Sequence, residues 1–466
     1  MKRRRIIPAI AVTLLALCCT ANYTLQMQES EKQFYAGKYL EAARTLLPYV
    51  NKSDEDQLLF MMEAGLMLHA GGEFEKSNQV LLSAADLSEK IATSISKGAV
   101  SLFLNDTVTN YKGEDFERVL IHMYLGMNFL MLDKPDEARV EFKRLDDILR
   151  GIKESGGKSY KQNLMAKYLY GLAFEISAVT QKDENDYNDA YVEYKQIYAQ
   201  DPAFESVKAD LLRMAKAIGD TEDYNKWRGK FGALDAGIPK DAGELVLVYQ
   251  SGQSAIKQSR GKLLADVQMK TAINVSLQGM SLAEGVTVAG VLVALAVAEN
   301  PIPKFVKRSN KGRYATISGK GVNGGSTYML EEIENTAVKN MEDQYASMYA
   351  KVAASIAVKA VASIAAGVAA KKLAKNMGGT VGAFSGLIGA AAGAGVGAGL
   401  ASQIKPDLRC WHSLPANLQV KKIFLKPGKY DLSLSAVGDS GVVDQKTIPV
   451  EIEAGKKTLL NYRTLF

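Results

Sequence analysis

A pattern of a turn, an aromatic residue or proline, and a small residue recurs four times in the first half of this 466-residue chain. The copies occupy residues 34–49, 69–82, 131–145 and 186–202, and the first two begin 35 residues apart. Each copy places a small residue inside a predicted helix, as Ala42, Ala138 and Ala190 illustrate. Because small side chains let two helix backbones approach closely, the pattern predicts helices packed in successive pairs.

This pattern resembles the tetratricopeptide repeat, whose period is 34 residues. The wider spacing of the later copies predicts inserted helices or loops. The resemblance implies an α-solenoid over residues 18–236, with a concave surface that suits a helix or an extended peptide. Such a region is typical of a scaffold rather than a catalyst. An irregular helical bundle without a binding groove is the alternative that the residues leave open.

The N-terminus has the features of an export signal. Residues 2–5 are basic, residues 6–17 are uncharged and mostly apolar, and Cys18 and Cys19 follow at once. The apolar run is too short to span a bilayer. Cleavage after residue 17 with lipidation of Cys18 or Cys19 is the favoured interpretation, with Cys18 preferred. Ordinary cleavage after Ala21 and a retained membrane anchor stay open as alternatives.

Charge divides the exported chain into two unlike halves. The whole sequence carries +6, but residues 18–236 hold 26 basic and 35 acidic residues, whereas residues 237–466 hold 27 basic and 16 acidic residues. A basic half points to a membrane surface, a polyanion or an acidic part of the same chain. Export excludes nucleic acid as the expected partner. Cys410 is the one cysteine outside the signal region, so no disulfide framework is expected.

The basic half is predicted to be mixed α/β. Residues 243–252 form a β-rich run, residues 292–298 and 313–318 suit strands or short helices, and residues 329–376 have a helical pattern. Alternating segments at 418–425, 430–437, 448–452 and 458–462 predict a small C-terminal β-sandwich-like module. We therefore expect an α+β multidomain protein. The predicted divisions are a signal peptide at 1–17, helical repeats at 18–236, a mixed α/β region at 237–376, a glycine-zipper segment at 377–404 and a β module at 405–466.

Residues 377–404 contain no charged side chain. Six glycines in this segment recur at intervals of four residues in two groups, a spacing that favours close helix packing. They are Gly378, Gly382, Gly386, Gly389, Gly393 and Gly397. The segment exceeds the length of about 20 residues that spans hydrocarbon. Two hypotheses follow: a helical hairpin packed within the protein, or a membrane-associated oligomer or pore assembled through these helices.

The sequence offers no convincing catalytic constellation. Residues 319–324 spell GxGxxG, but no acid follows at the place that a dinucleotide site needs, so a polar turn is favoured. Cys410 and His412 are too close in sequence to indicate a nucleophilic pair. The three histidines, His69, His122 and His412, have no metal-ligand spacing. We expect no enzyme activity, no cofactor and no metal.

The order of these segments resembles a family of bacterial envelope lipoproteins with tetratricopeptide-like N-terminal halves. Residues 244–249, 300–303, 407–416 and 426–430 carry the resemblance, and its most specific part is Arg-x-Trp-x-x-Leu-Pro. In that segment Arg409, Trp411, Leu414 and Pro415 are predicted to form a structural junction, with Trp411 buried under the β module. The resemblance implies a non-catalytic scaffold at the periplasmic side of the outer membrane. Its expected partners are envelope proteins bound by the repeats, the membrane bound by the lipid anchor and by 377–404, and further copies of the chain.

Overall fold

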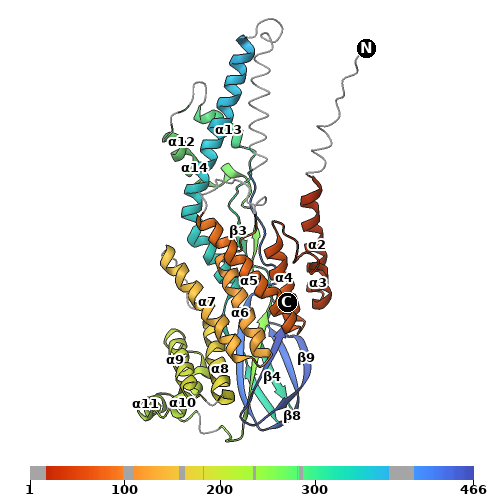
Figure 1. The fold of residues 1–466 in the computed structure, drawn as a ribbon, viewed down its shortest axis with the longest axis vertical. Coiled ribbons are helices and arrows are strands. Elements are labelled where there is room, and N and C mark those ends of the chain that lie inside the picture. Colours follow the sequence, from red (N-terminus) through yellow and green to blue (C-terminus); the bar gives the residue numbers. More distant parts are fainter. Residues whose placement is uncertain are drawn as a thin grey trace.

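The computed structural model describes residues 17–97, 110–156, 163–181, 183–234, 238–280, 282, 287–376 and 404–466. Helices from the first half of the chain lie beside two β-sheets from the second half (Figure 1). A long helix, α14, extends from this body together with two short helices, α12 and α13 (Figure 1). The molecule therefore consists of a body of helices and sheets and an arm of helices, which we describe in turn.

The helical half consists of five antiparallel hairpins among the described residues. They are α2 (Leu17–Tyr35) with α3 (Tyr39–Leu46), α4 (Gln57–Ala70) with α5 (Phe74–Lys97), α6 (Asp115–Met131) with α7 (Pro135–Gly156), α8 (Leu164–Gln181) with α9 (Asn185–Gln200), and α10 (Glu205–Ala217) with α11 (Thr221–Phe231). The first four coincide with the predicted repeat copies, and the fifth was not predicted. Part of the wider spacing comes from the lengths of α5 and α7, which contain 24 and 22 residues.

Three of the hairpins cross at a glycine of their first helix. A Cβ atom on Gly65 would lie 2.5 Å from Leu81, one on Gly126 would lie 2.6 Å from Phe142, and one on Gly171 would lie 2.5 Å from Tyr194. Real Cβ contacts are longer, so only glycine admits the large side chain of the second helix at these points. The predicted small residues Ala42, Ala138 and Ala190 are fully buried on the second helices. Close packing of helix pairs is thus confirmed for the repeat region.

Two four-stranded sheets form the β part of the body. The first has the order β10-β1-β7-β6 and the second β5-β4-β8-β9. Their strands are β1 (Gly243–Ser251), β4 (Gly312–Gly319), β5 (Val322–Ser326), β6 (Tyr328–Glu331), β7 (Asn417–Leu425), β8 (Gly428–Gly438), β9 (Gly441–Ile452) and β10 (Lys457–Arg463). All four C-terminal strands occur where they were predicted. However, β1 pairs with both β10 and β7, and β4 pairs with β8. Residues 405–466 therefore share both sheets with residues 237–376 and do not form a module of their own.

Strand β1 lies in the middle of three layers. Its Val246 and Val248 belong to the core shared with the helices, while Leu245, Leu247 and Tyr249 belong to the core between the two sheets. Successive side chains of a strand point to opposite faces, so alternate residues serve different cores. Every residue of β1 is buried as a result. The order of layers is helices, first sheet, second sheet.

The arm has a third, separate core. It comprises α12 (Val267–Gln278), α13 (Val288–Leu295) and part of α14 (Ile333–Asn376), with buried Ile404 packed among them. A two-stranded sheet of β2 (Ile256–Gln258) and β3 (Lys304–Val306) lies near its base. Residues 292–298, predicted as strand or short helix, mostly belong to α13. The helix predicted from 329 begins at Ile333 because residues 328–331 pair as β6 with β7.

Helix α14 has the length and composition of a membrane span. Residues Ile333–Ala366 contain an apolar window with a mean hydropathy of 1.4, of which 41% is buried in the structure, and no other helix in the described ranges has such a window. Residues 1–16 and 377–403 lie outside the described residues. The predicted signal peptide except Leu17, and the six zipper glycines, fall there, so the oligomer or pore hypothesis stays a prediction.

Candidate functional site: the repeat face that meets the sheet

The first helices of the hairpins face the first sheet. Tyr124 of α6 donates a hydrogen bond to Gln250 of β1 with an O–O distance of 3.0 Å. Arg213 of α10 pairs with Glu244 of β1 at 2.7 Å. On a tetratricopeptide-like solenoid the concave surface would be the binding surface. Here the inner face of the helices is covered by the chain's own sheet, so the open groove expected from the sequence is absent among the described residues.

A hydrogen-bond network around His69 joins three helices to the sheet. Its Nδ1 lies 2.5 Å from the side-chain oxygen Oδ1 of Asn128 on α6. Its Nε2 lies 2.7 Å from the side-chain nitrogen Nε2 of Gln250 on β1 and 3.1 Å from the side-chain nitrogen Nδ2 of Asn461 on β10. Asn128 in turn donates to Ser77 of α5 at 2.8 Å. Burial lowers the pKa of His69 to about 4. The ring is therefore neutral near pH 7 and accepts hydrogen bonds from the strands as a structural residue.

A buried cluster of six charges fixes the later hairpins to the sheet. Its members are Glu175 of α8, Asp210 and Arg213 of α10, Glu244 of β1, Lys422 of β7 and Lys457 of β10. The three acids and three bases balance. The shortest nitrogen–oxygen distances are 2.6 Å from Arg213 to both Glu175 and Asp210, and 2.7 Å from Arg213 to Glu244. We call this set the ion cluster.

The ion cluster favours the charged forms of Glu175 and Lys422 despite burial, whereas burial raises the pKa of Asp210. Burial alone would raise the pKa of Glu175, but Arg213, Lys422 and Lys457 hold it well below its usual range. Burial likewise opposes the charged form of Lys422, but Asp210 and Glu175 raise its pKa well above the usual range. Removing one member of such a set leaves the neighbouring charges buried without a partner of opposite sign. The cluster therefore makes attachment of the repeats to the sheet depend on all of its members together.

The predicted junction lies in an extended segment, residues 404–416, which we call the strap. The Arg409 guanidinium pairs with Asp407 at 2.8 Å and reaches Asp56, just before α4, at 2.7 Å. It also lies over the ring of Tyr111, 5.3 Å from the centroid. Arg409 thus ties the strap to the helical repeats rather than to the sheets.

Trp411, Leu414 and Pro415 are all buried in the strap. The Trp411 ring lies 5.8 Å from that of Tyr124 on α6, and Leu414 belongs to the core shared by helices and sheet. The Leu414 carbonyl accepts a hydrogen bond from the Ser254 amide at 2.9 Å. The four predicted residues come together between the repeats and the first sheet. Trp411 was predicted to lie under the β module; the contacts of its ring and backbone described here are with Tyr124 and Glu117 of α6.

Two buried glutamates accept hydrogen bonds from the backbone of the strap. Glu117 of α6 accepts the amide N–H of Trp411 at 2.7 Å, and Glu63 of α4 accepts those of His412 and Ser413 at 2.5 and 3.2 Å. Burial raises the pKa of Glu63 to about 7. Neither glutamate was predicted from the sequence. Their signal was available, because Glu63 interrupts an otherwise apolar helix whose single acid needs buried donors.

The strap also brings Cys410 and His412 near Glu31 of α2. His412 Nδ1 is hydrogen-bonded to Glu31, and burial of the ring is outweighed by Cys410 and Glu31, which raise the pKa of His412 well above its usual value. Cys410 is only 1% exposed. A nucleophile must meet its substrate, so this arrangement is suited to holding the strap rather than to catalysis.

The remaining chemical motifs have structural explanations. The GxGxxG residues form the turn of an antiparallel hairpin, because Gly319 ends β4 and Val322 begins β5. A dinucleotide fingerprint requires a strand followed by a helix. Across the ranges given above, no group of three or more His, Cys, Asp or Glu side chains is placed to hold a metal ion. His122 pairs with Glu141 across α6 and α7 at 2.7 Å.

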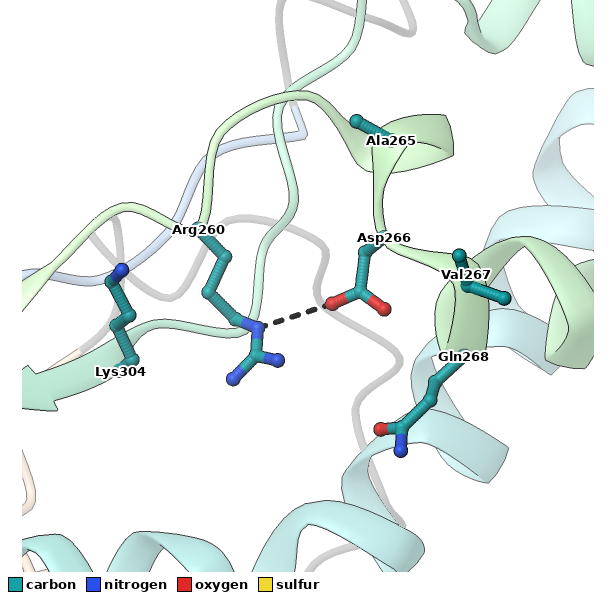
Figure 2. Close-up of a pocket in the computed structure, with 6 residues that line it drawn as sticks. All are labelled: Arg260, Ala265, Asp266, Val267, Gln268 and Lys304. Atoms are coloured by element: carbon teal, nitrogen blue, oxygen red, sulfur yellow. Dashed lines mark hydrogen bonds and ion pairs between the residues drawn. The ribbon is translucent and has the colours of Figure 1, made fainter.

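A cavity of about 450 Å³ lies at the base of the arm, beside the start of α12 (Figure 2). It is lined by Arg260, Ala265, Asp266, Val267, Gln268 and Lys304. Its one acid, Asp266, pairs with Arg260 at 3.1 Å and accepts hydrogen bonds from Tyr349 and Asn300. These contacts use the carboxylate within the fold, so we assign the cavity no ligand.

The predicted lipid acceptors lie at the beginning of α2. Cys18 and Cys19 belong to its first turn, and their side chains are outside the described set. Met27 and Ser30 of the same helix are buried, and the Ser30 hydroxyl donates to the Ala42 carbonyl at 3.0 Å. About two helical turns therefore separate the cysteines from the packed body.

No protein-family model matches this chain, and no curated protein matches it. Among solved structures, it is similar to TPR-like repeats of a Podosopora anserina protein described as a kinesin light chain, at 13% identity, covering 46% of this chain and 95% of that one with a TM-score of 0.31. It is also similar to MamA from Desulfovibrio magneticus RS-1, at 14% identity, covering 46% and 94% with a TM-score of 0.30. Scores this low carry no argument, so function has to be inferred from the geometry.

Proposed function

We propose that the protein is a non-catalytic scaffold of the bacterial envelope and that its helical repeats bind a protein partner. The observation that carries this proposal is the division of the repeat surface. The sheet and the strap cover much of the first helices, where Leu25 of α2 and Val179 of α8 stay exposed. Three of the second helices present exposed apolar side chains: Leu82 on α5, Val140 on α7 and Val192 on α9. The partner surface is therefore the outer, second-helix face and not the inner groove.

The charge of the repeats indicates what this partner is like. Residues 18–236 hold nine more acidic than basic residues. Some acids on α7 and α9 are internally paired, since Lys167 bridges Asp146 at 3.2 Å and Glu193 at 3.0 Å. The surplus acids favour a partner with a basic surface, because complementary charge speeds association and selects among partners.

A photo-cross-linking amino acid at Val140 or Val192 tests this surface in cells. We expect a discrete cross-linked species from both positions and none from Val442, which is at least as exposed but lies on β9. Cross-links from Val442 alone, or from none of the three positions, would contradict a partner on the repeats.

The second part of the proposal is attachment to the membrane by lipid. We propose that the chain is exported, lipidated at Cys18 or, less favoured, Cys19, and held at the periplasmic side of the outer membrane. The short distance from these cysteines to the packed residues of α2 supports it, because a lipid there holds the body directly at the bilayer. Globomycin should cause an uncleaved precursor to accumulate, and Cys18→Ser should do the same while Cys19→Ser should not. If globomycin does not change the processing of the precursor, the proposed lipidation is refuted.

A further inference from the structure

The outer surface of the arm exposes large apolar side chains that nothing in the described structure covers. On α12, Val267 is 76% and Val275 is 64% exposed; on or just after α13, Val293 is 76% and Val297 is 64% exposed. Val358 of α14 is also exposed. Single exposed apolar residues are ordinary, but a group gathered on two neighbouring helices marks an interaction surface.

Helix α13 shows why this surface is unusual. All eight of its residues, VAGVLVAL, are uncharged and apolar, yet only Val291 and Leu295 are buried. A helix that is apolar on every side is normally surrounded by protein or by lipid. The other side of α13 faces outward, so an apolar environment is missing there.

The charges of the arm specify the kind of environment. From residue 344 to residue 404 the sequence contains five lysines and no aspartate or glutamate. Two of these lysines, Lys351 and Lys359, lie on α14 beside the arm core. Residues 266–299, which include α12 and α13, contain Lys270 and three acids, Asp266, Glu284 and Glu299, of which Asp266 is paired with Arg260. The positive charge that fits anionic headgroups therefore comes from the lysines of α14, beside an apolar face on α12 and α13.

The position of the arm agrees with this assignment. In Figure 1 the beginning of α2 and the helices of the arm lie at the same end of the molecule, and the second sheet lies at the other. This step rests on the proposed lipidation, because a lipid at Cys18 would bring that end of the body to the bilayer. α14 also contains the one described segment with the composition of a membrane span.

We propose that the outer face of α12 and α13, formed by Val267, Val275, Val293 and Val297, inserts into the interfacial region of a bilayer with anionic lipids. The valines enter the boundary between headgroups and acyl chains, and the lysines of the arm meet the headgroup phosphates. The arm is then a second membrane contact, independent of the lipid anchor.

Vesicle flotation of the mature chain, residues 18–466 with Cys18→Ser and Cys19→Ser, tests the arm without the anchor. We expect flotation with vesicles of phosphatidylglycerol and phosphatidylethanolamine, and less with phosphatidylcholine alone. Val267→Glu combined with Val293→Glu should lower the partition coefficient at least about tenfold, because two apolar contacts become charged ones. Val442→Glu, on exposed β9, is the matched control and should float like the parent. Circular dichroism melting verifies that each variant is folded.

Two results would overturn the proposal: a parent that does not float with the anionic vesicles, or a double variant that floats as well as the parent. Sedimentation without lipid tests whether a second copy of the chain covers this face instead. If the parent is a dimer, and the double variant is a monomer that still floats like the parent, the face binds a second copy and not the bilayer. An environment-sensitive dye on Val293→Cys should gain fluorescence with vesicles, whereas the same dye on Val442→Cys should not. Failure of lipidation in the globomycin experiment leaves all these results unaffected, so the two proposals fail separately.

Discussion

Helices α4 and α13 have similar apolar compositions and opposite surroundings. In α4, residues 58–69 are all buried, because α5 lies on one side and the first sheet and strap lie on the other. In α13 only two residues are buried, although its sequence contains no polar side chain. An apolar helix must be surrounded by protein or lipid, but its own sequence does not say which of the two surrounds it. For α4 the chain itself provides the cover, and for α13 we propose that a bilayer does.

The largest expected effect concerns the ion cluster, which joins the covered helices to their sheet. Lys422→Ala should lower the free energy of unfolding of the body by about 3–5 kcal/mol, because Asp210 and Glu175 lose a buried partner. Urea denaturation followed by circular dichroism measures this. Lys429→Ala, at an exposed position of β8, should change it by less than about 0.5 kcal/mol. Equal effects of the two variants would mean that the cluster does not hold repeats and sheet together.

The next effect depends on pH and on the cover over α4. The pKa of His69 is lowered from 6.5 to about 4 by burial, so its contribution to stability is fully present above pH 6.5 and is lost as pH falls toward 4. The loss amounts to about 3 kcal/mol at most. Unfolding free energies of the parent and of His69→Gln, compared between pH 7 and pH 4, should converge by this amount.

The comparison with a variant is needed because Glu63 titrates in the same range with the opposite sign. Its pKa is raised to about 7, so its contribution is greatest below pH 4.5 and is lost as pH rises through 7. A constant difference between parent and His69→Gln across this range would show that the His69 ring is not held neutral. NMR titration of the imidazole gives the same answer directly.

A smaller effect tests the hairpin crossings. Gly126→Ala should cost about 1–3 kcal/mol of unfolding free energy, because the added methyl group meets the Phe142 ring. Gly151→Ala, inside α7 with no neighbour within 4 Å, should instead stabilise the protein by up to about 1 kcal/mol. Shortening the neighbour by Phe142→Leu should relieve the clash in the Gly126→Ala background. Equal outcomes for the two alanine variants would show that the crossing is looser than described.

The smallest effect separates the two sides of α13. Val291→Ala should destabilise the arm by about 1–2 kcal/mol, since the side chain is buried in the arm core. Val293→Ala should change stability by no more than about 0.5 kcal/mol, because its side chain is mostly in solvent. Thermal melts of the two variants in the absence of lipid measure the difference. A large loss for Val293→Ala would indicate cover by protein and weaken the proposed bilayer contact.

Local structure could largely be predicted from this sequence. The repeat pattern located four of the five hairpins, and alternation located the C-terminal strands, because both follow from neighbours in sequence. The fifth hairpin, α10 with α11, escaped since it has no small residue at the expected place. The pairing of β1 with β10 escaped as well, because more than 200 residues separate partners such as Glu244 and Lys457. No local pattern specifies such a pair.

The candidate site was predictable only in part. Arg409 and Trp411 were identified as a junction, but their partners Asp56, Glu117 and Tyr124 lie far away along the chain. The open groove was expected because repeats of this type usually present one. Residues 58–68 are apolar except for Glu63, and this composition argued for cover on both sides of the helix before the structure was known.

The place of β10 beside β1 has a consequence for synthesis. The final strand, residues 457–463, completes the sheet that covers the inner face of the repeats. Until the ribosome has made these last residues, the apolar helices that are synthesised first lack their finished cover. Contacts so distant in sequence slow folding, so this face of the helices stays without its full cover until β10 pairs with β1. A chain that stops before β10 would expose apolar helix surface, which gives proteases a way to remove it.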